Sequence, residues 1–272
     1  MSASAVPLTS PFSSFWNRRW SGDYLFLIRN LIAKDFRVRY RNMSLGMFWS
    51  LLNPLVMMTV LWFVWTRIFP NNGIPHFAVF ALCGLVPFNI FSVSWSIGTT
   101  SLIDNASLIK RVPVPREIIP IASVLGNCVN MSAQIALLLV MVLIIGKTPN
   151  WYWLWLPYIW GFEIVFTCGL VLLFAGLNVY IRDIRYVVES TNVVLFWLVP
   201  IVYPTSMIQP QYVPIYHYNP LASVIIALRN ILLDGTAPQG HIIRNLTCVS
   251  IAMFIFGLWA FRKLQAKVYN YL

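Results

Sequence analysis

The sequence FAVFALCGLVPFNIFSVSWSIGTTSLI, from Phe77 to Ile103, runs for 27 residues without a charged side chain. A helix that crosses the hydrocarbon core of a bilayer needs about 20 predominantly apolar residues. This stretch is therefore long enough to cross a membrane as one helix, and it predicts that the chain is an integral membrane protein.

Similar uncharged stretches recur along the chain, separated by short charged segments. They predict an all-α membrane protein with a disordered cytoplasmic tail, residues 1–21, and one transmembrane domain, residues 22–272. Because each stretch holds about 20 helical residues, we expect six membrane-spanning helices, at about residues 45–68, 77–103, 119–146, 156–180, 187–205 and 242–262.

The composition excludes an ordinary water-soluble protein. Hydrophobic residues make up 59% of the chain and charged residues only 10%, whereas soluble domains carry about 25% charged residues. The net charge of +11 lies in short segments beside the predicted spans, so it does not indicate nucleic-acid binding. The four cysteines are far apart in the sequence and indicate apolar packing rather than disulfides or a metal site.

The basic residues predict the orientation in the membrane. In a six-span arrangement, 15 of the 19 Lys and Arg residues lie on the side of the two termini, which is therefore expected to be cytoplasmic. The N-terminal segment lacks the apolar core of a cleavable signal, so the first span is expected to be retained.

Two segments outside the spans are predicted to be helical. Residues 22–41 alternate apolar and basic positions with a helical period, typical of an interfacial helix on the inner leaflet, or of a simple membrane anchor. Residues 206–235 contain several prolines and are expected to form short broken helices that re-enter the outer leaflet.

No motif in the chain supplies an energy source or a reaction. Gly146-Lys147-Thr148 is not a P-loop, because Met141 stands where such a loop requires glycine. Glu163 is the one acidic residue deep inside a predicted span and is a functional candidate, although it could pair with Lys147 or Arg67 or reach water. We therefore expect no enzyme activity, and an ATP-driven machine would need a separate ATPase.

Aromatic residues recur at helical spacing within or beside several predicted spans. Aromatic faces can stack on the apolar faces of sugar rings, and they also pack well against one another. The alternatives are a channel through which a glycan slides and ordinary core packing. The candidate channel aromatics are Trp62, Trp65, Phe69, Phe88, Phe91, Trp95, Phe196, Trp197 and Tyr203.

Four segments, in order, resemble the permease subunits of polysaccharide-exporting ABC transporters, which move O-antigen, capsule or teichoic acid precursors. They are RVRYRNMSLGMFWSLLNPLVMM (Arg37–Met58), NASLIKRVPVPREIIPIASVLGN (Asn105–Asn127), NVYIRDIRYVVE (Asn178–Glu189) and YNPLASVIIALRNILLDG (Tyr218–Gly235). Together with the spans between them, they cover nearly the whole chain.

The resemblance implies a homodimer in the bacterial inner membrane, with two ATPase subunits that bind ATP and Mg, and no cofactor in this chain. It implies that spans one and five line the channel and that residues 206–235 form an outer gate. The interfacial helix and one cytoplasmic loop would contact the ATPase, the loop through Asn105, Leu108, Lys110, Arg111, Pro113, Pro115, Arg116 and Glu117.

We expect the cargo to be a glycan on an undecaprenyl-type lipid, with O-antigen as the first candidate and capsule and teichoic acid as alternatives. Arg37, Arg39 and Arg41 could attract its pyrophosphate, because one guanidinium group can donate two parallel hydrogen bonds to two phosphate oxygens. A narrow apolar cavity would instead favour a small lipid or drug exporter. A polar pocket joining Glu163 or Asp183 to a histidine would favour a glycosyl or acyl transferase, and a scaffold would have no cavity.

Overall fold

The computed structural model describes residues 23–41, 48–68, 74–111 and 114–264, and all regular structure in these ranges is helical. The predictions for residues 1–21, Phe69 and Pro113 lie outside the described residues. In chain order the elements are α2 (Tyr24–Tyr40), α3 (Phe48–Phe63), the π-helical turn η1 (Val64–Ile68), α4 (Phe77–Asp104), α5 (Ala106–Arg111), α6 (Ile118–Ile144), η2 (Trp151–Trp155), α7 (Leu156–Tyr180), α8 (Ile184–Leu198), η3 (Thr205–Met207), α9 (Val213–Tyr218), α10 (Pro220–Leu232) and α11 (Gly240–Leu264).

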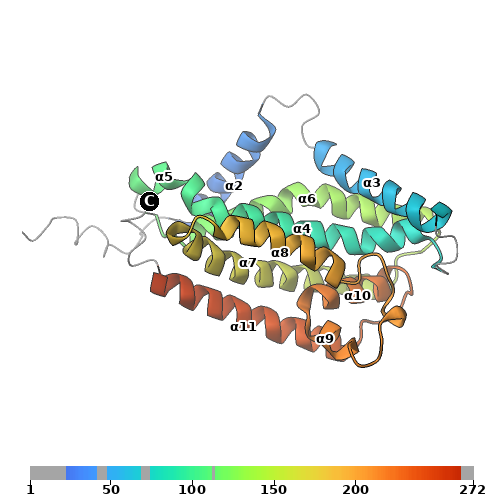
Figure 1. The fold of residues 1–272 in the computed structure, drawn as a ribbon. Coiled ribbons are helices and arrows are strands. Elements are labelled where there is room, and N and C mark those ends of the chain that lie inside the picture. Colours follow the sequence, from blue (N-terminus) through green and yellow to red (C-terminus); the bar gives the residue numbers. More distant parts are fainter. Residues whose placement is uncertain (1–22, 42–47, 69–73, 112–113, 265–272) are drawn as a thin grey trace, which may run out of the picture.

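Four long apolar helices run side by side through the molecule (Figure 1). By length and composition, Phe77–Arg111, Ile118–Ile144, Trp151–Tyr180 and Gly240–Leu264 could each cross a membrane. The other two predicted spans correspond to shorter helices, α3 with 16 residues and α8 with 15. The structure thus confirms an all-helical membrane protein within the described residues.

Helix α8 corrects the predicted limits of the fifth span. The expected helix at 187–205 begins earlier, at Ile184, and ends at Leu198. Pro200 follows two residues later, and proline excludes the preceding residue from helical geometry. Val199 is accordingly extended, and residues 199–202 pack into the core as non-helical backbone.

Helix α4 forms the centre of the molecule. It packs against α3, α6, α7, α8 and α10, and most of its 28 residues are buried. A helix that is apolar on every side is stable only when protein or lipid surrounds it. The uncharged stretch with which the sequence analysis began is therefore the innermost helix of the bundle.

Glycines bring α7 and α11 into close contact. A Cβ atom at Gly257 would lie 2.0 Å from the carbonyl oxygen of Gly169, a distance that no real side chain tolerates. Small residues allow helices in a bilayer to approach until their backbones touch. This pair therefore requires glycine at the crossing point of the two helices.

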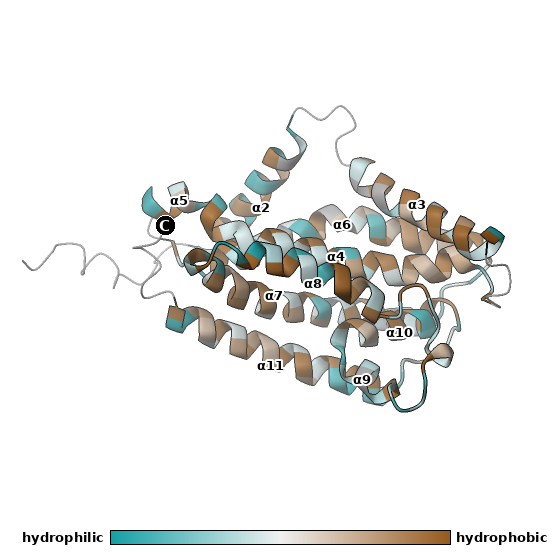
Figure 2. Cartoon of the chain, in the orientation of Figure 1, coloured by the Kyte–Doolittle hydropathy of each residue, from teal (hydrophilic) through white to brown (hydrophobic). Residues whose placement is uncertain are grey.

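The two ends of the bundle differ in character. The helices α2 and α5 lie at one end, together with the last turn of α11, and α9, α10 and the start of α11 lie at the other (Figure 1). Hydrophilic residues are prominent on α2 and α5, whereas hydrophobic residues dominate the long helices (Figure 2). Exposed apolar side chains line α3 and α8 in particular: Phe48, Trp49, Val56, Val60, Phe63, Val193, Val194, Trp197 and Leu198.

Candidate functional site

A groove with a volume of about 450 Å³ lies between α4 and α8. Its walls combine aromatic rings, small hydroxyl groups, an amide and a carboxylate. The lining residues are Phe88, Ser92, Val93, Ser96, Ile97, Glu189, Asn192, Val193, Phe196 and Trp197. The mixture of apolar faces and hydrogen-bonding groups suits a sugar, which presents both kinds of surface.

Three of the predicted channel aromatics meet in this groove. The rings of Phe88 and Phe196 lie 5.6 Å apart, edge to face, and those of Phe196 and Trp197 lie 5.3 Å apart, also edge to face. The side chain of Trp197 is 62% exposed. The groove thus has two rings fixed by packing and one outer ring free to contact a ligand.

Asn192 supplies the polar centre of the groove. Its amide nitrogen donates to the hydroxyl oxygen of Ser96 at 3.1 Å and to the carbonyl oxygen of Ser92 at 3.3 Å. Its amide oxygen is buried and has no hydrogen-bond partner among the described residues. A buried acceptor without a partner is costly, and a ligand hydroxyl could satisfy it.

Asn192 and Glu189 were not among the predicted site residues. Both precede Phe196 on α8, by four and seven residues, and those intervals place side chains on one helix face. The helical period around Phe196 was therefore the signal that could have found them.

Other predicted channel aromatics lie elsewhere. Phe91 and Trp95 are buried in the core, and Trp95 packs edge to face on Phe174 at 5.1 Å. Phe91 and Trp95 therefore pack in the core and do not line the groove. Trp65 stacks on Phe77 near the end of α3, and Trp62 is exposed on α3.

Tyr203 has a local structural role. Its hydroxyl lies 3.1 Å from the carbonyl oxygens of Trp197 and Leu198, which end α8. The carbonyl groups of the last helical turn need donors from outside the helix. Tyr203 thus stabilises the end of the helix that carries Trp197.

At the opposite end, α2 and α5 are joined. The ammonium group of Lys34 on α2 donates to the side-chain oxygen of Asn105, which precedes α5. The amide of Asn105 in turn donates to the carbonyl oxygen of Ser101 at 2.8 Å. Leu31 and Ile109 belong to one buried apolar cluster. These contacts bind the predicted interfacial helix to the predicted ATPase-contacting loop.

The loop offers a charged face beyond this attachment. Lys110 and Arg111 are exposed at the end of α5. Partial burial lowers the pKa of Arg116 from its ordinary value, though a guanidinium remains protonated at neutral pH. The remaining predicted contact residues of the described loop are half-buried: Leu108, Pro115, Arg116 and Glu117.

The predicted pyrophosphate-attracting arginines lie at the C-terminal end of α2. Arg37 and Arg41 are exposed, and Arg39 belongs to the helix although its side chain lies outside the described residues. Asp23 caps the start of this helix by accepting from the backbone N–H of Leu25 at 2.8 Å. The helix is therefore present as predicted, and its position on a membrane surface stays a prediction.

Glu163 differs from its predicted environment. Its side chain is 1% exposed, and neither carboxyl oxygen has a hydrogen-bond partner among the described residues. Among the described residues Glu163 forms no ion pair, so the alternative of a pairing with Lys147 or Arg67 is wrong. The reason is geometric, because Glu163 faces the interior of the helix bundle whereas Lys147 lies in its outer loop region.

Comparison with known proteins places these features in context. The family profile described as "ABC-2 type transporter" matches residues 27–233. The chain is 32% identical over 253 residues to an O-antigen export system permease protein of Klebsiella pneumoniae, covering 93% of this chain and 96% of that protein.

More distant relatives extend over similar lengths. A protein of the same description from Myxococcus xanthus is 29% identical over 239 residues, covering 87% of this chain and 90% of its own. A polysialic acid transport protein of Escherichia coli is 25% identical over 244 residues, covering 86% and 92%. The family match over residues 27–233 includes the groove, the α2–α5 attachment and α10.

Proposed function

Since the chain belongs to the ABC-2 type transporter family, we propose that it is the membrane-spanning subunit of an ABC exporter that carries polysaccharide, with O-antigen as the cargo. The relatives named for O-antigen and polysialic acid support this class of cargo. The observation that carries the proposal is the α4–α8 groove, where aromatic rings and an unsatisfied amide oxygen lie together.

In our proposal, six helices cross the inner membrane and both termini are cytoplasmic. Helix α3 continues through η1 to Ile68, and such a length approaches the hydrocarbon thickness at about 1.5 Å per residue. Helix α8 is shorter, and the buried extended residues 199–202 would complete its path. The basic end with α2 and α5 then faces the cytoplasm.

The assembly we propose is a homodimer with two ATPase subunits. The groove opens between α4 and α8; α8 has exposed apolar side chains, as does α3, which packs on α4. A second copy facing these surfaces would close the groove into a channel and remove the apolar faces from lipid. The ATPase subunits, which would bind ATP and Mg, would contact α2 and also α5, the latter through Lys110 and Arg111.

Transport would begin at the cytoplasmic end. The arginines at the end of α2 would attract the pyrophosphate of an undecaprenyl-type carrier. Movement of α5 by the ATPase would reach α2 through the Lys34–Asn105 hydrogen bond. The glycan would then slide along Phe88, Phe196 and Trp197, and each contact must be weak for the polymer to leave.

A matched pair of tryptophans tests the groove. In cells that depend on this permease, Trp197→Ala should lower O-antigen at the surface several-fold, because the exposed stacking face is lost. Trp259→Ala on α11 removes a ring of similar exposure, 57%, away from the groove and should leave export unchanged. Surface glycan is measured by immunoblot at equal permease abundance, and equal export by the two variants would contradict the assignment.

A further inference from the structure

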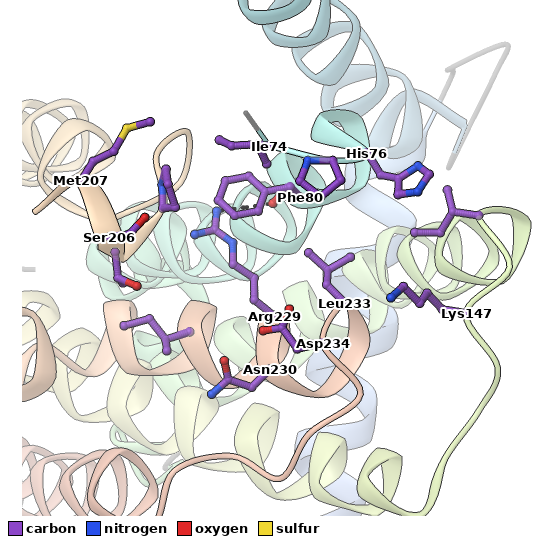
Figure 3. Close-up of a pocket in the computed structure, with 15 residues that line it drawn as sticks. Ile74, His76, Phe80, Lys147, Ser206, Met207, Arg229, Asn230, Leu233 and Asp234 are labelled. Atoms are coloured by element: carbon purple, nitrogen blue, oxygen red, sulfur yellow. Dashed lines mark hydrogen bonds between the residues drawn. The ribbon is translucent and has the colours of Figure 1, made fainter. Parts of the chain in front are cut away.

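A second cavity, of about 460 Å³, lies at the α9–α10 end of the molecule. The loop before α4, the segment from Pro204 to Met207 and the end of α10 form its walls (Figure 3). It shares no lining residue with the α4–α8 groove. Its size is typical of a small-ligand pocket.

The guanidinium group of Arg229 forms part of one wall of this cavity. It lies 3.5 Å from the centre of the Phe80 ring (Figure 3). It also donates to the carbonyl oxygen of Ile201 at 2.7 Å. Longer bonds, of 3.4 Å, reach the carbonyl oxygens of Tyr203 and Phe80. These contacts fix the charge in place, and the side chain is only 7% exposed.

Among the described residues Arg229 forms no ion pair, although the charge of Asp234 in the same cavity acts on it through space. No carboxylate of the described residues lies within ion-pair distance of Arg229, and its Nε–H is buried without an acceptor. Burial lowers the pKa of Arg229 to about 10, so the side chain is protonated at neutral pH. Carbonyl dipoles and a ring face offset only part of the cost of burying a cation.

The other charged groups of the cavity leave it net positive. Lys147 enters from the loop after α6, and Asp234 follows α10. The cavity lining thus includes two cationic side chains, one carboxylate and the imidazole of His76. Asn230, Thr205 and Ser206 add neutral hydrogen-bonding groups to the same walls.

We propose that this cavity is an oxyanion-binding site that takes a phosphate group. Arginine and lysine together are the usual protein partners of phosphate, and the cavity has room for a pyrophosphate or a phosphorylated sugar. The phosphate would come from a soluble compound or from a phospholipid headgroup. The site goes beyond the proposed export function, because it does not depend on which polymer crosses the membrane.

Binding of inorganic pyrophosphate to the full-length chain tests the site. The chain is placed in nanodiscs of phosphatidylcholine at constant ionic strength, and tryptophan fluorescence follows a titration with pyrophosphate. Lys147→Gln should raise the Kd about threefold and Asp234→Asn should lower it about threefold, since each changes one charge in a partly exposed cavity. Lys263→Gln, beside Trp259 at the other end of the bundle, should not change it.

The two wall variants avoid the buried arginine, so loss of folding does not confuse the result. Opposite shifts in Kd support the site, and an absence of binding, or equal effects of all three variants, would overturn it. A second titration in nanodiscs that contain phosphatidylglycerol distinguishes the sources. If phosphatidylglycerol competes with pyrophosphate, the site binds lipid headgroups. If it does not compete, the site binds soluble phosphates. Export assays with Trp197→Ala test the proposed function separately.

Discussion

At the scale of single residues, the α7–α11 crossing gives the sharpest expectation. Gly257→Ala should destabilise the protein by about 1–3 kcal/mol, because its Cβ would overlap the backbone of Gly169 and force the helices apart. Gly161→Ala is the matched control, since a Cβ there meets no atom within 4 Å and alanine favours the helix. Thermal unfolding in detergent measures both, and an unchanged midpoint for Gly257→Ala would show that the helices do not touch.

The sequence predicts residue types more reliably than residue surroundings. Phe88, Phe91 and Trp95 share one helical spacing and are all buried, yet only Phe88 also lines the groove. The spacing cannot separate them because α4 is enclosed on several sides, and neighbouring helices decide which face meets a cavity. The surroundings of Arg229 were not predictable either, because the carbonyl groups that accept its hydrogen bonds lie 26 to 149 residues away in the sequence.

At the scale of elements, the Lys34–Asn105 bond joins α2 to α5 and should transmit movement between them. Lys34→Ala should lower export several-fold while the ATPase subunit still co-purifies, because the binding face of α5 is intact. Lys110→Glu should instead weaken co-purification, since it reverses a charge on that face. Pull-down and export assays separate the two effects, and loss of ATPase binding in Lys34→Ala would refute a purely transmitting role.

Element boundaries were mostly predictable where charge or proline marks them. The first helix, expected at 22–41, is found at 24–40, and short helices occupy the expected 206–235 region. The end of α8 was missed although Pro200 marks it, because the uncharged stretch from Ser190 to Leu228 shows no charge that would limit the helix. That stretch holds the end of α8, an extended segment, η3, α9 and most of α10. Beyond Pro200, the packing of Val199, Ile201 and Val202 into the core determines the path of the chain, and the sequence does not show which neighbours they meet.

At the scale of the whole molecule, the exposed apolar faces of α3 and α8 need lipid or a partner to cover them. We expect the second copy to cover α8, since the open groove lies beside it. In a Cys248→Ser background, Val194→Cys on α8 should give a covalent dimer with a short bis-maleimide, whereas the equally exposed Ile255→Cys on α11 should not. Gel electrophoresis of treated membranes measures the product. A dimer from Ile255→Cys alone would place the interface on α11 and leave the α4–α8 groove open to lipid.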